Sequence, residues 1–489
     1  MNLLNIALGS WLLVVFIQCK ATPLDDYVNT PDSAFGWKRI STYPQSLYTT
    51  YVLNMTSQQW FDSSFSTRPI WWHYVIIVVP KTFRRPKTAF LLIDGGSNSD
   101  SPPTSSGIAS MASSSGSVIA TIRQIPNQNI RFLSDPTSSS RSEDSLIGWT
   151  WKRYLETNGS DPRILLRFPM TKAVIRAMDT VEQFLAQENY PVPQEFVLAG
   201  GSKRGWTTWT SAAVDNRRVV AAAPIVMDLL NLRANMMSHY RSLGGWTFAF
   251  YDYYVQNITR YMNSPSFDKL AQMVDPYSYI DRYNKMKIYQ VQGAGDEFFL
   301  PDSEEFFWND LQKATGGSYL RRIPNTGHNA GGYQDSLYSF YLSVADRTIL
   351  PAMTWTRMTN ATHGTIRAVV DFSNGKAKAS AVTAYQARTS DTSKRDFRQS
   401  KLDSSGKVVS SGIVWANTAV QLESQSATSA IYTIVVPIPS DGYWTATYIQ
   451  ASFPGPDSTT LILTTESLIL PNTYPIPECK DQGCYGTLV

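Results

Sequence analysis

Two kinds of hydrophobic pattern divide this chain near Pro351. Before this residue, short apolar runs alternate with stretches whose apolar residues recur at helical spacing, such as residues 171–189. Strands that alternate with helices predict an α/β domain with a mostly parallel sheet and helices on both of its faces. After Pro351, short alternating runs rich in Thr, Val, Tyr and Ser are separated by Asn-Gly, Ser-Gly and Asp-Gly turns. This second pattern predicts an antiparallel β-sandwich.

The apolar runs give the expected order of elements. An antiparallel pair of strands is expected to open the α/β domain, around residues 60–61 and at residues 71–79. The strands expected next are residues 89–94, 117–122, 196–199, 219–227, 286–293 and 318–323, and the helices are residues 145–156, 171–189, 206–214 and 335–344. The strands of the β-sandwich are expected at residues 365–371, 379–387, 412–415, 430–437, 443–452 and 460–463. Ligands of α/β folds bind beyond the carboxyl ends of the parallel strands, so chemistry is expected there.

The N-terminal segment, residues 1–21, is predicted to be a signal peptide. Its apolar stretch is too short to span a bilayer, and Cys19-Lys20-Ala21 ends it in a small-x-small cleavage pattern. A buried helix is the alternative, because no Lys or Arg precedes the apolar stretch. No later apolar run is long enough for a transmembrane helix, so we expect a secreted protein without a membrane span. The expected parts of the mature chain are an α/β domain at residues 22–352 with an insertion at about residues 229–282, a β-sandwich at residues 353–470 and a tail at residues 471–489.

Charge and cysteine content narrow the class of protein. The net charge of +4 is small for 489 residues and no basic run stands behind it, so nothing favours nucleic-acid binding. Removal of the signal peptide would leave Cys479 and Cys484 as a pair, which we expect to form a disulfide in an oxidising compartment. Their spacing is not that of a zinc site, and we expect neither a metal nor a cofactor. Four sequons predict glycosylation on exposed loops, at Asn54, Asn158, Asn257 and Asn360.

A glycine-rich segment follows the strand expected at residues 196–199. It reads Gly200-Gly-Ser-Lys-Arg-Gly-Trp206, and small helix-compatible residues come after it. A serine at such a strand–turn–helix is raised above the sheet, where its hydroxyl can act as a nucleophile. Gly200 and Ser202 match the G-x-S-x-G pattern, but the last glycine is shifted by one place to Gly205. The alternative is a Gly-Ser loop in which Ser202 only caps the helix.

Two further strand ends carry residues suited to act with Ser202. Asp296 and His328 follow the last two strands expected in the α/β domain. The chain order Ser, Asp, His is that of an α/β-hydrolase, in which the histidine is the base and the carboxylate orients it. Of the four histidines His328 is the one in the required place, although a loop histidine with a single hydrogen bond is the alternative. Asp228, at the end of an earlier strand, is the rival acid; Asp296 is favoured because its Gly-rich loop comes one strand before His328.

An oxyanion hole needs backbone N–H groups directed at the developing negative charge. The N–H of Lys203, directly after the nucleophile, is one expected donor, and the loop with Gly95 and Gly96 is expected to supply the second. A plain strand-ending turn is the alternative for these glycines. The side chains of Lys203 and Arg204 place positive charge here, either to steer an acidic group or to pair with Asp or Glu nearby.

Residues 229–282 are rich in aromatic side chains, namely Tyr240, Trp246, Phe248, Phe250, Tyr251, Tyr253 and Tyr254. Two interpretations stay open. The insertion is either a lid over an aromatic-walled pocket, or its aromatic residues are ordinary core.

Several short motifs along the chain share one resemblance. They are Gly201-Ser-Lys-Arg-Gly-Trp206, Gly295-Asp-Glu-Phe-Phe-Leu-Pro-Asp302, Pro324-Asn-Thr-Gly-His328, Trp71-Trp-His73, Gln124-Ile-Pro-Asn127 and Glu143-Asp-Ser-Leu146 with Thr150-Trp151. Together they resemble the PhoPQ-activated pathogenicity-related (PqaA-type) family, over about residues 25–470. The resemblance implies an α/β-hydrolase fold and supports the positions of Ser202, Asp296 and His328. It leaves the substrate open, because the family's name records regulation in bacteria and not a reaction.

Two functions follow from these observations. The first is a serine hydrolase that cleaves an ester or peptide bond of a small-molecule substrate through an acyl-enzyme. The second is a secreted signalling or binding protein that acts on a cell-surface receptor, with catalysis absent or incidental. An intact Ser-His-Asp set favours the first, whereas the family's secreted eukaryotic members, described as autocrine proliferation repressors, favour the second. The fold alone does not decide between them.

Overall fold

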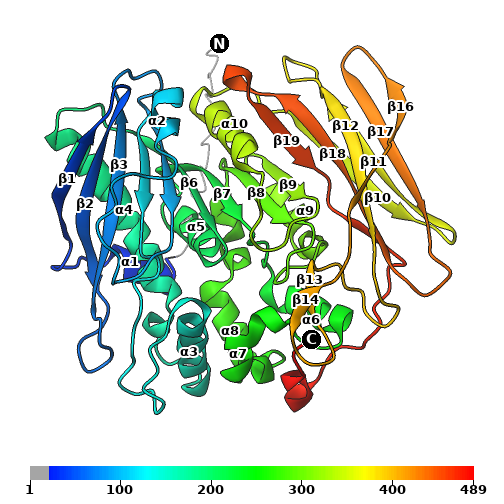
Figure 1. The fold of residues 1–489 in the computed structure, drawn as a ribbon, viewed down its shortest axis with the longest axis horizontal. Helices are drawn as coiled ribbons and strands as arrows, with labels where there is room; N and C mark the ends of the chain where they lie inside the picture. Colours follow the sequence, from blue (N-terminus) through cyan, green and yellow to red (C-terminus); the bar gives the residue numbers. More distant parts are fainter. Residues whose placement is uncertain (1–20) are drawn as a thin grey trace, which may run out of the picture.

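The computed structural model describes residues 21–489, so the predicted signal peptide, apart from Ala21, lies outside the described residues. These residues form a nine-stranded sheet covered by helices, with a β-sandwich of two further sheets beside it (Figure 1). The strand order of the large sheet is β1-β2-β3-β5-β4-β6-β7-β8-β9. Its strands are β1 (Gly36–Pro44), β2 (Tyr48–Gln59), β3 (Ile70–Pro80), β4 (Thr88–Ile93), β5 (Ile119–Ile122), β6 (Glu195–Gly201), β7 (Val219–Ile225), β8 (Lys287–Gly293) and β9 (Ser318–Ile323).

The order in which successive strands are added to this sheet reverses at β4. β1, β2, β3 and β5 pair antiparallel in this order, whereas β5, β4, β6, β7, β8 and β9 run parallel. β5 and β6, which follow β4 in the chain, lie on opposite sides of it. The carboxyl end of β4 is therefore a switch point, where open α/β sheets bind their ligands. The predicted α/β-hydrolase fold, with a mostly parallel sheet, is confirmed.

Helices cover both faces of the sheet. α4 (Arg167–Gln187) and α5 (Lys203–Val214) pack on one face, and α2 (Ser110–Ser115) and α10 (Gln334–Ala345) pack on the other. The other α-helices outside the insertion are α1 (Pro23–Asn29), α3 (Glu143–Glu156) and α9 (Trp308–Ala314). No helix within residues 21–489 combines the length and the apolar character needed to cross a membrane.

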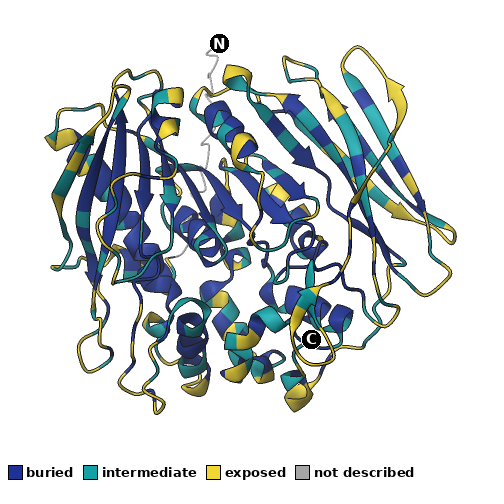
Figure 2. Ribbon diagram, viewed as in Figure 1, coloured by how far each residue is buried: buried dark blue, intermediate teal, exposed yellow. Residues whose placement is uncertain are grey.

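Strand β6 shows how the sequence produces this layering. Phe196 and Leu198 join the hydrophobic cluster of α4 and α5, whereas Val197 and Ala199 join the cluster of α10. Successive side chains of a strand point to opposite faces, so a strand that is apolar throughout is buried on both sides. Figure 2 shows the central strands buried along most of their length.

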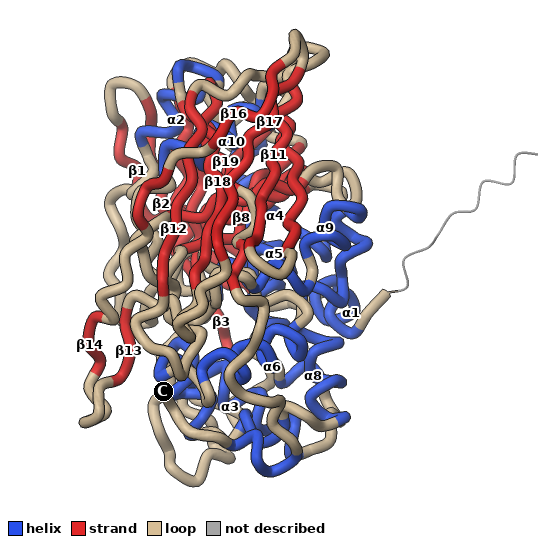
Figure 3. The backbone as a smooth tube through the Cα atoms, turned by 90° about the vertical axis from the view of Figure 1, so that its right-hand side faces the viewer, coloured by secondary structure: helices blue, strands red, loops and turns tan. Residues whose placement is uncertain are grey.

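The β-sandwich begins directly after α10 and is antiparallel throughout, as predicted. One sheet has the order β10-β11-β17-β16 and the other β15-β12-β18-β19, with β20 paired to β18. Figure 3 shows these layers turned toward the viewer. The strands are β10 (Ala352–Thr359), β11 (His363–Asp371), β12 (Ala381–Arg388), β15 (Ala416–Thr418), β16 (Gln421–Gln425), β17 (Ser429–Pro437), β18 (Thr445–Pro454), β19 (Thr460–Thr464) and β20 (Leu468–Leu470). A separate hairpin consists of β13 (Ser400–Leu402) and β14 (Val408–Ser410). β19 packs on α10 and β9, so one hydrophobic cluster includes residues of both domains.

Two strand predictions are wrong. Residues 60–61 are not a strand, because β2 ends at Gln59 and Phe61 has a left-handed φ of 56°. Residues 412–415 are not a strand either. The backbone of Trp415 bonds instead to the side chain of Asn325 in the α/β domain, donating to its Oδ1 at 2.8 Å and accepting from its Nδ2 at 3.0 Å. Each run has large apolar side chains because Trp60, Ile413 and Trp415 are buried in loops, not because they belong to a sheet.

The sequons do not all lie on exposed loops. Asn54 is half-buried in the middle of β2, which contradicts that prediction. Asn158 and Asn360 are exposed, at turns after α3 and β10. Asn257 is half-buried directly before a short helix of the insertion.

The insertion after β7 forms a group of helices that lies with α3 beyond one end of the strands, at the bottom of Figure 3. Its elements are α6 (Leu232–Leu243), η2 (Phe248–Phe250), α7 (Tyr251–Val255), η3 (Ile258–Tyr261), α8 (Pro265–Val274) and η4 (Pro276–Tyr283). Its aromatic residues differ in their surroundings: Trp246 is fully buried, whereas Tyr251 is 60% exposed.

The C-terminal tail returns to this insertion. The predicted disulfide between Cys479 and Cys484 is confirmed, with a Cα–Cα distance of 4.9 Å. The indole Nε1 of Trp246 donates to Cys484 O at 2.9 Å, and its backbone N–H donates to Thr487 O at 2.8 Å. The rings of Tyr254 and Tyr485 stack with their centroids 4.5 Å apart. The tail is therefore bonded to the insertion and not to the nearby sandwich alone.

Candidate active site

Ser202 occupies the sharp turn between β6 and α5. Its backbone has φ 55° and ψ −124°, a conformation that a residue with a side chain adopts only where the surrounding structure imposes it. Gly200 and Gly205 make room for this turn. A Cβ on Gly200 would lie 2.7 Å from Arg204 O, and a Cβ on Gly205 would lie 2.9 Å from Met227 Cβ. The glycine that is shifted by one place in the motif thus allows the close packing of helix on strand that the turn requires.

Asp296 and His328 follow β8 and β9, as predicted from the sequence; His328 reaches Ser202, and Asp296 reaches His328. Nε2 of His328 lies 2.8 Å from Ser202 Oγ. Nδ1 of His328 lies 3.0 and 2.9 Å from the two carboxylate oxygens of Asp296. Parallel strands bring their carboxyl ends to one edge of a sheet, so three residues far apart in the chain form one continuous series of hydrogen bonds.

The carboxylate of Asp296 is fixed by its own loop. Its Oδ1 accepts hydrogen bonds from the N–H groups of Phe298 at 2.7 Å and Phe299 at 3.2 Å. Asp228, the rival acid, is also buried, but neither of its carboxylate oxygens has a hydrogen-bond partner among the described residues. Burial raises the pKa of Asp228 well above its ordinary value. The acid that contacts His328 is therefore Asp296.

The pKa of His328 is raised above its ordinary value of 6.5. Burial of the imidazole opposes its protonation, but the charge and the hydrogen bond of Asp296 favour the imidazolium more strongly. The rings of Phe298 and Phe299 flank the imidazole, with centroids 4.3 and 5.7 Å from it. Such surroundings suit a base that takes a proton and returns it while a carboxylate stabilises the charged form.

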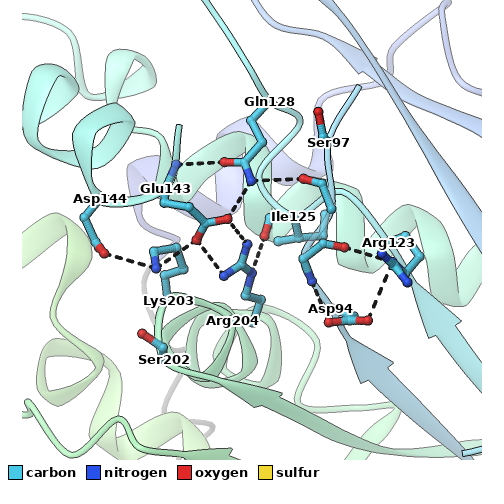
Figure 4. Close-up of polar contacts among 12 residues, drawn as sticks. Asp94, Ser97, Arg123, Ile125, Gln128, Glu143, Asp144, Ser202, Lys203 and Arg204 are labelled. Atoms are coloured by element: carbon cyan, nitrogen blue, oxygen red, sulfur yellow. Dashed lines mark hydrogen bonds and ion pairs between the residues drawn. The ribbon is translucent and has the colours of Figure 1, made fainter. Parts of the chain in front are cut away.

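Glu143 is at the centre of a charge network beside the β6–α5 turn (Figure 4). Its carboxylate accepts two hydrogen bonds from Arg204, at 2.7 and 2.5 Å, and lies 2.9 Å from Nζ of Lys203. Nε2 of Gln128 donates to the same carboxylate at 2.5 Å and to Gly96 O at 2.9 Å. Burial opposes ionisation of Glu143, but these partners, Arg204 first, hold its pKa at about 2. The two basic side chains next to Ser202 are thus paired within the protein.

The loop after β4 lies against this network. A Cβ on Gly95 would lie 2.7 Å from Nη2 of Arg204. The N–H of Gly95 donates to Asp94 Oδ1 at 2.7 Å, whereas no described residue accepts a hydrogen bond from the N–H of Gly96. Lys203 is the first residue of α5, directly after Ser202. The backbone N–H groups of Lys203 and Gly96 therefore have no acceptor among the described residues, whereas that of Gly95 has one.

An apolar pocket opens beside Ser202, with an empty volume of about 600 Å³ that is partly open to solvent. It is lined by Asp144, Trp151, Ser202, Lys203, Trp206, Met227, Leu229, Leu232, Met236, Phe250, Tyr253, Ile258, Thr259, Met262, Phe267, Phe298 and Phe299. Much of this wall belongs to the insertion. Some aromatic residues of the insertion therefore line the pocket, and others are ordinary core. Phe250 and Tyr253 reach the pocket, whereas Trp246 is core.

Other titratable groups of the described residues have separate surroundings. Nε2 of His73 lies 2.9 Å from Ser57 Oγ, and Nε2 of His239 accepts from the N–H of Thr247 at 3.0 Å. Burial lowers the pKa of His73 to about 4 and that of His239 to about 3. No group of three or more His, Cys, Asp or Glu side chains within residues 21–489 is arranged to hold a metal ion.

Glu143 and Gln128 were not predicted from the sequence as part of the site. A signal for Glu143 was present, because the acidic pair Glu143-Asp144 complements the basic pair Lys203-Arg204. No pattern pointed to Gln128, whose role depends on how its loop passes Gly96.

Three solved structures with related folds are hydrolases. An acetyl xylan esterase from Paenibacillus sp. R4 has 14% sequence identity and a TM-score of 0.46, over 66% of this chain and 92% of that chain. A glucuronoyl esterase from Solibacter usitatus has 12% identity and a TM-score of 0.39, over 66% of this chain and 90% of that chain. An S-formylglutathione hydrolase from Agrobacterium tumefaciens has 14% identity and a TM-score of 0.36, over 63% and 96%. Similarity at this level says nothing about the substrate.

Sequence comparison gives a stronger relationship. "Autocrine proliferation repressor protein A" of Dictyostelium discoideum is 38% identical over 97% of this chain and 96% of that protein. Residues 24–398 match the family of PhoPQ-activated pathogenicity-related proteins, and this range includes Ser202, Asp296 and His328. The chain therefore belongs to the PhoPQ-activated pathogenicity-related protein family.

Proposed function

We propose that this protein is a secreted serine hydrolase that cleaves an ester or peptide bond through an acyl-enzyme. The observation that carries the proposal is the series of hydrogen bonds from Ser202 through His328 to Asp296. A hydroxyl within hydrogen-bonding distance of a base, whose other nitrogen is held by a carboxylate, is the arrangement that acyl transfer requires.

In the proposed reaction Ser202, His328 and Asp296 act once in the acylation step and once in the deacylation step. Nε2 of His328 takes the proton of Ser202 Oγ as this oxygen attacks the substrate carbonyl. Asp296 keeps the other proton on Nδ1 and stabilises the imidazolium. The N–H groups of Lys203 and Gly96 are the proposed donors to the oxyanion. The imidazolium then protonates the leaving alcohol or amine, and water releases the acyl group by the same route.

Labelling with a fluorophosphonate probe tests the proposal. We expect a covalent adduct on the peptide that contains Ser202 and none in Ser202→Ala. Ser57→Ala is a matched control, because the hydroxyl of Ser57 is also hydrogen-bonded to a histidine but is fully buried, and this variant should label like the wild type. A folded wild-type protein that takes up no probe at Ser202 contradicts the proposal.

Secretion is a separate part of the proposal and rests on the sequence of residues 1–21. Expression of the full chain in a eukaryotic host is expected to release protein into the medium with Thr22 as its first residue. Protein that stays in the cells with residues 1–21 attached contradicts this part.

The name of the Dictyostelium relative favours a second candidate, an autocrine signalling protein that acts on a cell-surface receptor. Purified wild type and Ser202→Ala, added to proliferating cells, separate the two candidates. A signal that is independent of catalysis remains in Ser202→Ala, whereas a signal that depends on hydrolysis is lost.

A further inference from the structure

The pocket beside Ser202 presents mainly carbon atoms to anything that enters it. Trp151, Met227, Met262 and Phe267 are part of its wall, and each is at most 5% exposed. They come from α3, from the end of β7 and from the insertion, so the pocket is formed between the sheet and the insertion. Methionine side chains adapt their shape to apolar ligands, and aromatic side chains are common in the walls of ligand pockets.

The same pocket begins at the atoms proposed to react. Ser202 lines it, and so does Phe298, whose ring centroid lies 4.3 Å from that of His328. Leu232 and Met262 of the insertion belong to the same wall. A group held in the pocket is therefore next to Ser202 Oγ.

The charged and hydroxyl groups of the wall already have partners in the protein. Asp144 lies 3.1 Å from Nζ of Lys203 and accepts a hydrogen bond from Tyr253 at 3.0 Å. Nζ of Lys203 also contacts Glu143 at 2.9 Å. The hydroxyl of Thr259 donates to the carbonyl of Tyr485 at 3.2 Å. These groups would have to break existing interactions before they could bind a ligand.

This pairing discriminates between classes of ligand. A sugar hydroxyl or an ionised group that entered the pocket would leave water without gaining an equivalent partner. An alkyl or aryl group would only exchange its contact with water for contact with carbon, which is favourable.

The acyl group and the leaving group of the substrate remain at the site for different lengths of time. The leaving group departs after the first step, whereas the acyl group stays on Ser202 until water releases it. An apolar pocket that starts at Ser202 suits the group that stays, even though part of it is open to solvent.

Building on the proposed hydrolase function, we propose that this pocket binds an apolar acyl group, either an alkyl chain or an aromatic ring attached to the scissile carbonyl. The preferred substrates are then esters or amides of apolar carboxylic acids. Acetyl groups and sugar acids are poor substrates, because they leave the pocket empty or place polar groups in it.

A series of p-nitrophenyl esters tests this on the full protein. From acetate through butyrate to hexanoate, kcat/KM is expected to rise by about fourfold for each methylene that the pocket buries. The pocket assignment is overturned if kcat/KM stays constant or falls from acetate to hexanoate while Ser202 still reacts with the fluorophosphonate. That result leaves the proposed function intact. Absence of both labelling and ester hydrolysis overturns the two together.

Variants of the wall locate the effect. Met262→Trp fills the pocket and is expected to lower kcat/KM for hexanoate by about tenfold or more, while acetate changes by less than about threefold. Met358→Trp is the matched control, because Met358 is 54% exposed on β10 and should behave like the wild type. If Met262→Trp does not fold, Met236→Gln tests the same point, since an amide at similar volume should lower the ratio of hexanoate to acetate hydrolysis. An unchanged ratio in a folded variant counts against the pocket.

Binding without turnover gives an independent readout. Trp151 and Trp206 line the pocket, so hexanoic acid is expected to change the tryptophan fluorescence of Ser202→Ala, and glucose at the same concentration is not. A response to glucose and none to hexanoic acid overturns the proposal.

Discussion

The backbone N–H of Gln399 donates to the carbonyl of Gly295 at 2.8 Å, and the N–H of Gly295 donates to Thr326 O at 2.9 Å. A loop of the β-sandwich is thus bonded to the loop that carries Asp296, which is bonded in turn to the loop that carries His328. A Cβ on Gly295 would lie 2.7 Å from Gln399 Cγ and 3.1 Å from its backbone nitrogen. The C-terminal domain therefore contacts the loop of Asp296 directly and the loop of His328 through it, and helps to hold both in place.

Gly295→Ala is expected to push these loops apart. A displacement of the acid or the base by about 1 Å can lower the rate by roughly a hundredfold, so kcat should fall by this order while the protein stays folded. Gly331→Ala is the control: Gly331 is in the loop of His328, but nothing lies within 4 Å of the position that a Cβ would take there. Ester hydrolysis and thermal unfolding of both variants check this, and equal activity of the two would contradict the proposed support.

The pH dependence of kcat/KM should report His328. Only the neutral imidazole can accept the proton of Ser202, and the pKa of His328 is raised, so activity should fall as the pH drops through a midpoint above 6.5. Asp296→Asn removes the charge that raises this pKa and leaves the burial that lowers it. The acid limb should then move to lower pH, while kcat falls by about ten-thousandfold because the tautomer is no longer fixed. An unshifted acid limb in Asp296→Asn would assign that limb to another group.

Glu143 should make the folded state more resistant to acid. Its pKa is about 2 in the folded protein, against an ordinary 4.5, so its ionised form stabilises the fold above pH 4.5, and this contribution is lost as the pH falls through 2. Glu143→Gln is expected to cost about 1 kcal/mol near neutral pH, because Lys203 and Arg204 lose a charged partner but the side chain of Glu143 is 37% exposed, so water screens part of this interaction. Chemical denaturation of the variant and the wild type should give free energies of unfolding that converge toward pH 2.

Glu156→Gln is the control for this experiment. Glu156 is at the other end of α3, where its carboxylate forms an exposed ion pair with Arg153. Exposed pairs contribute little, so this variant should unfold like the wild type at every pH. A difference between Glu143→Gln and the wild type that does not depend on pH would rule out the ionised carboxylate as its cause.

Loss of the disulfide should loosen the tail and leave the central sheet intact. The bond between Cys479 and Cys484 closes a short loop, and such a loop stabilises by about 2 kcal/mol. In Cys484→Ala, hydrogen exchange should increase in residues 479–489 and in the segment around Trp246 that binds them. Protection in β6 to β9 should not change, and loss of protection there would make the bond a part of the core.

The buried parallel strands were the easiest elements to predict from the sequence. β4 is buried along most of its length, and its bounds, Thr88–Ile93, differ by one residue from those of the apolar run at residues 89–94. β1 was missed, because at the edge of the sheet it carries exposed and half-exposed polar residues and has no apolar run. Residues 60–61 were wrongly predicted as a strand because they are large and apolar, whereas Trp60 is fully buried in a loop.

The residues proposed to react were accessible to prediction because their positions depend on the order of the strands. Ser202, Asp296 and His328 each follow a parallel strand, so the topology alone brings them to one edge. The partners of Glu143 could not be predicted in the same way. They depend on the direction of long side chains from α3, from α5 and from the loop of Gln128, which no periodic pattern fixes.

Thr259 and Tyr485 are translated at very different times. The hydroxyl of Thr259, in the wall of the pocket, donates to the carbonyl of Tyr485, which is 226 residues later in the chain. On the ribosome, the strands that carry Ser202 and Asp296 emerge well before the β-sandwich and the tail. A nascent chain with a folded central sheet therefore still lacks this hydrogen bond to the pocket wall, and the wall gains it only when the C-terminal tail has been made.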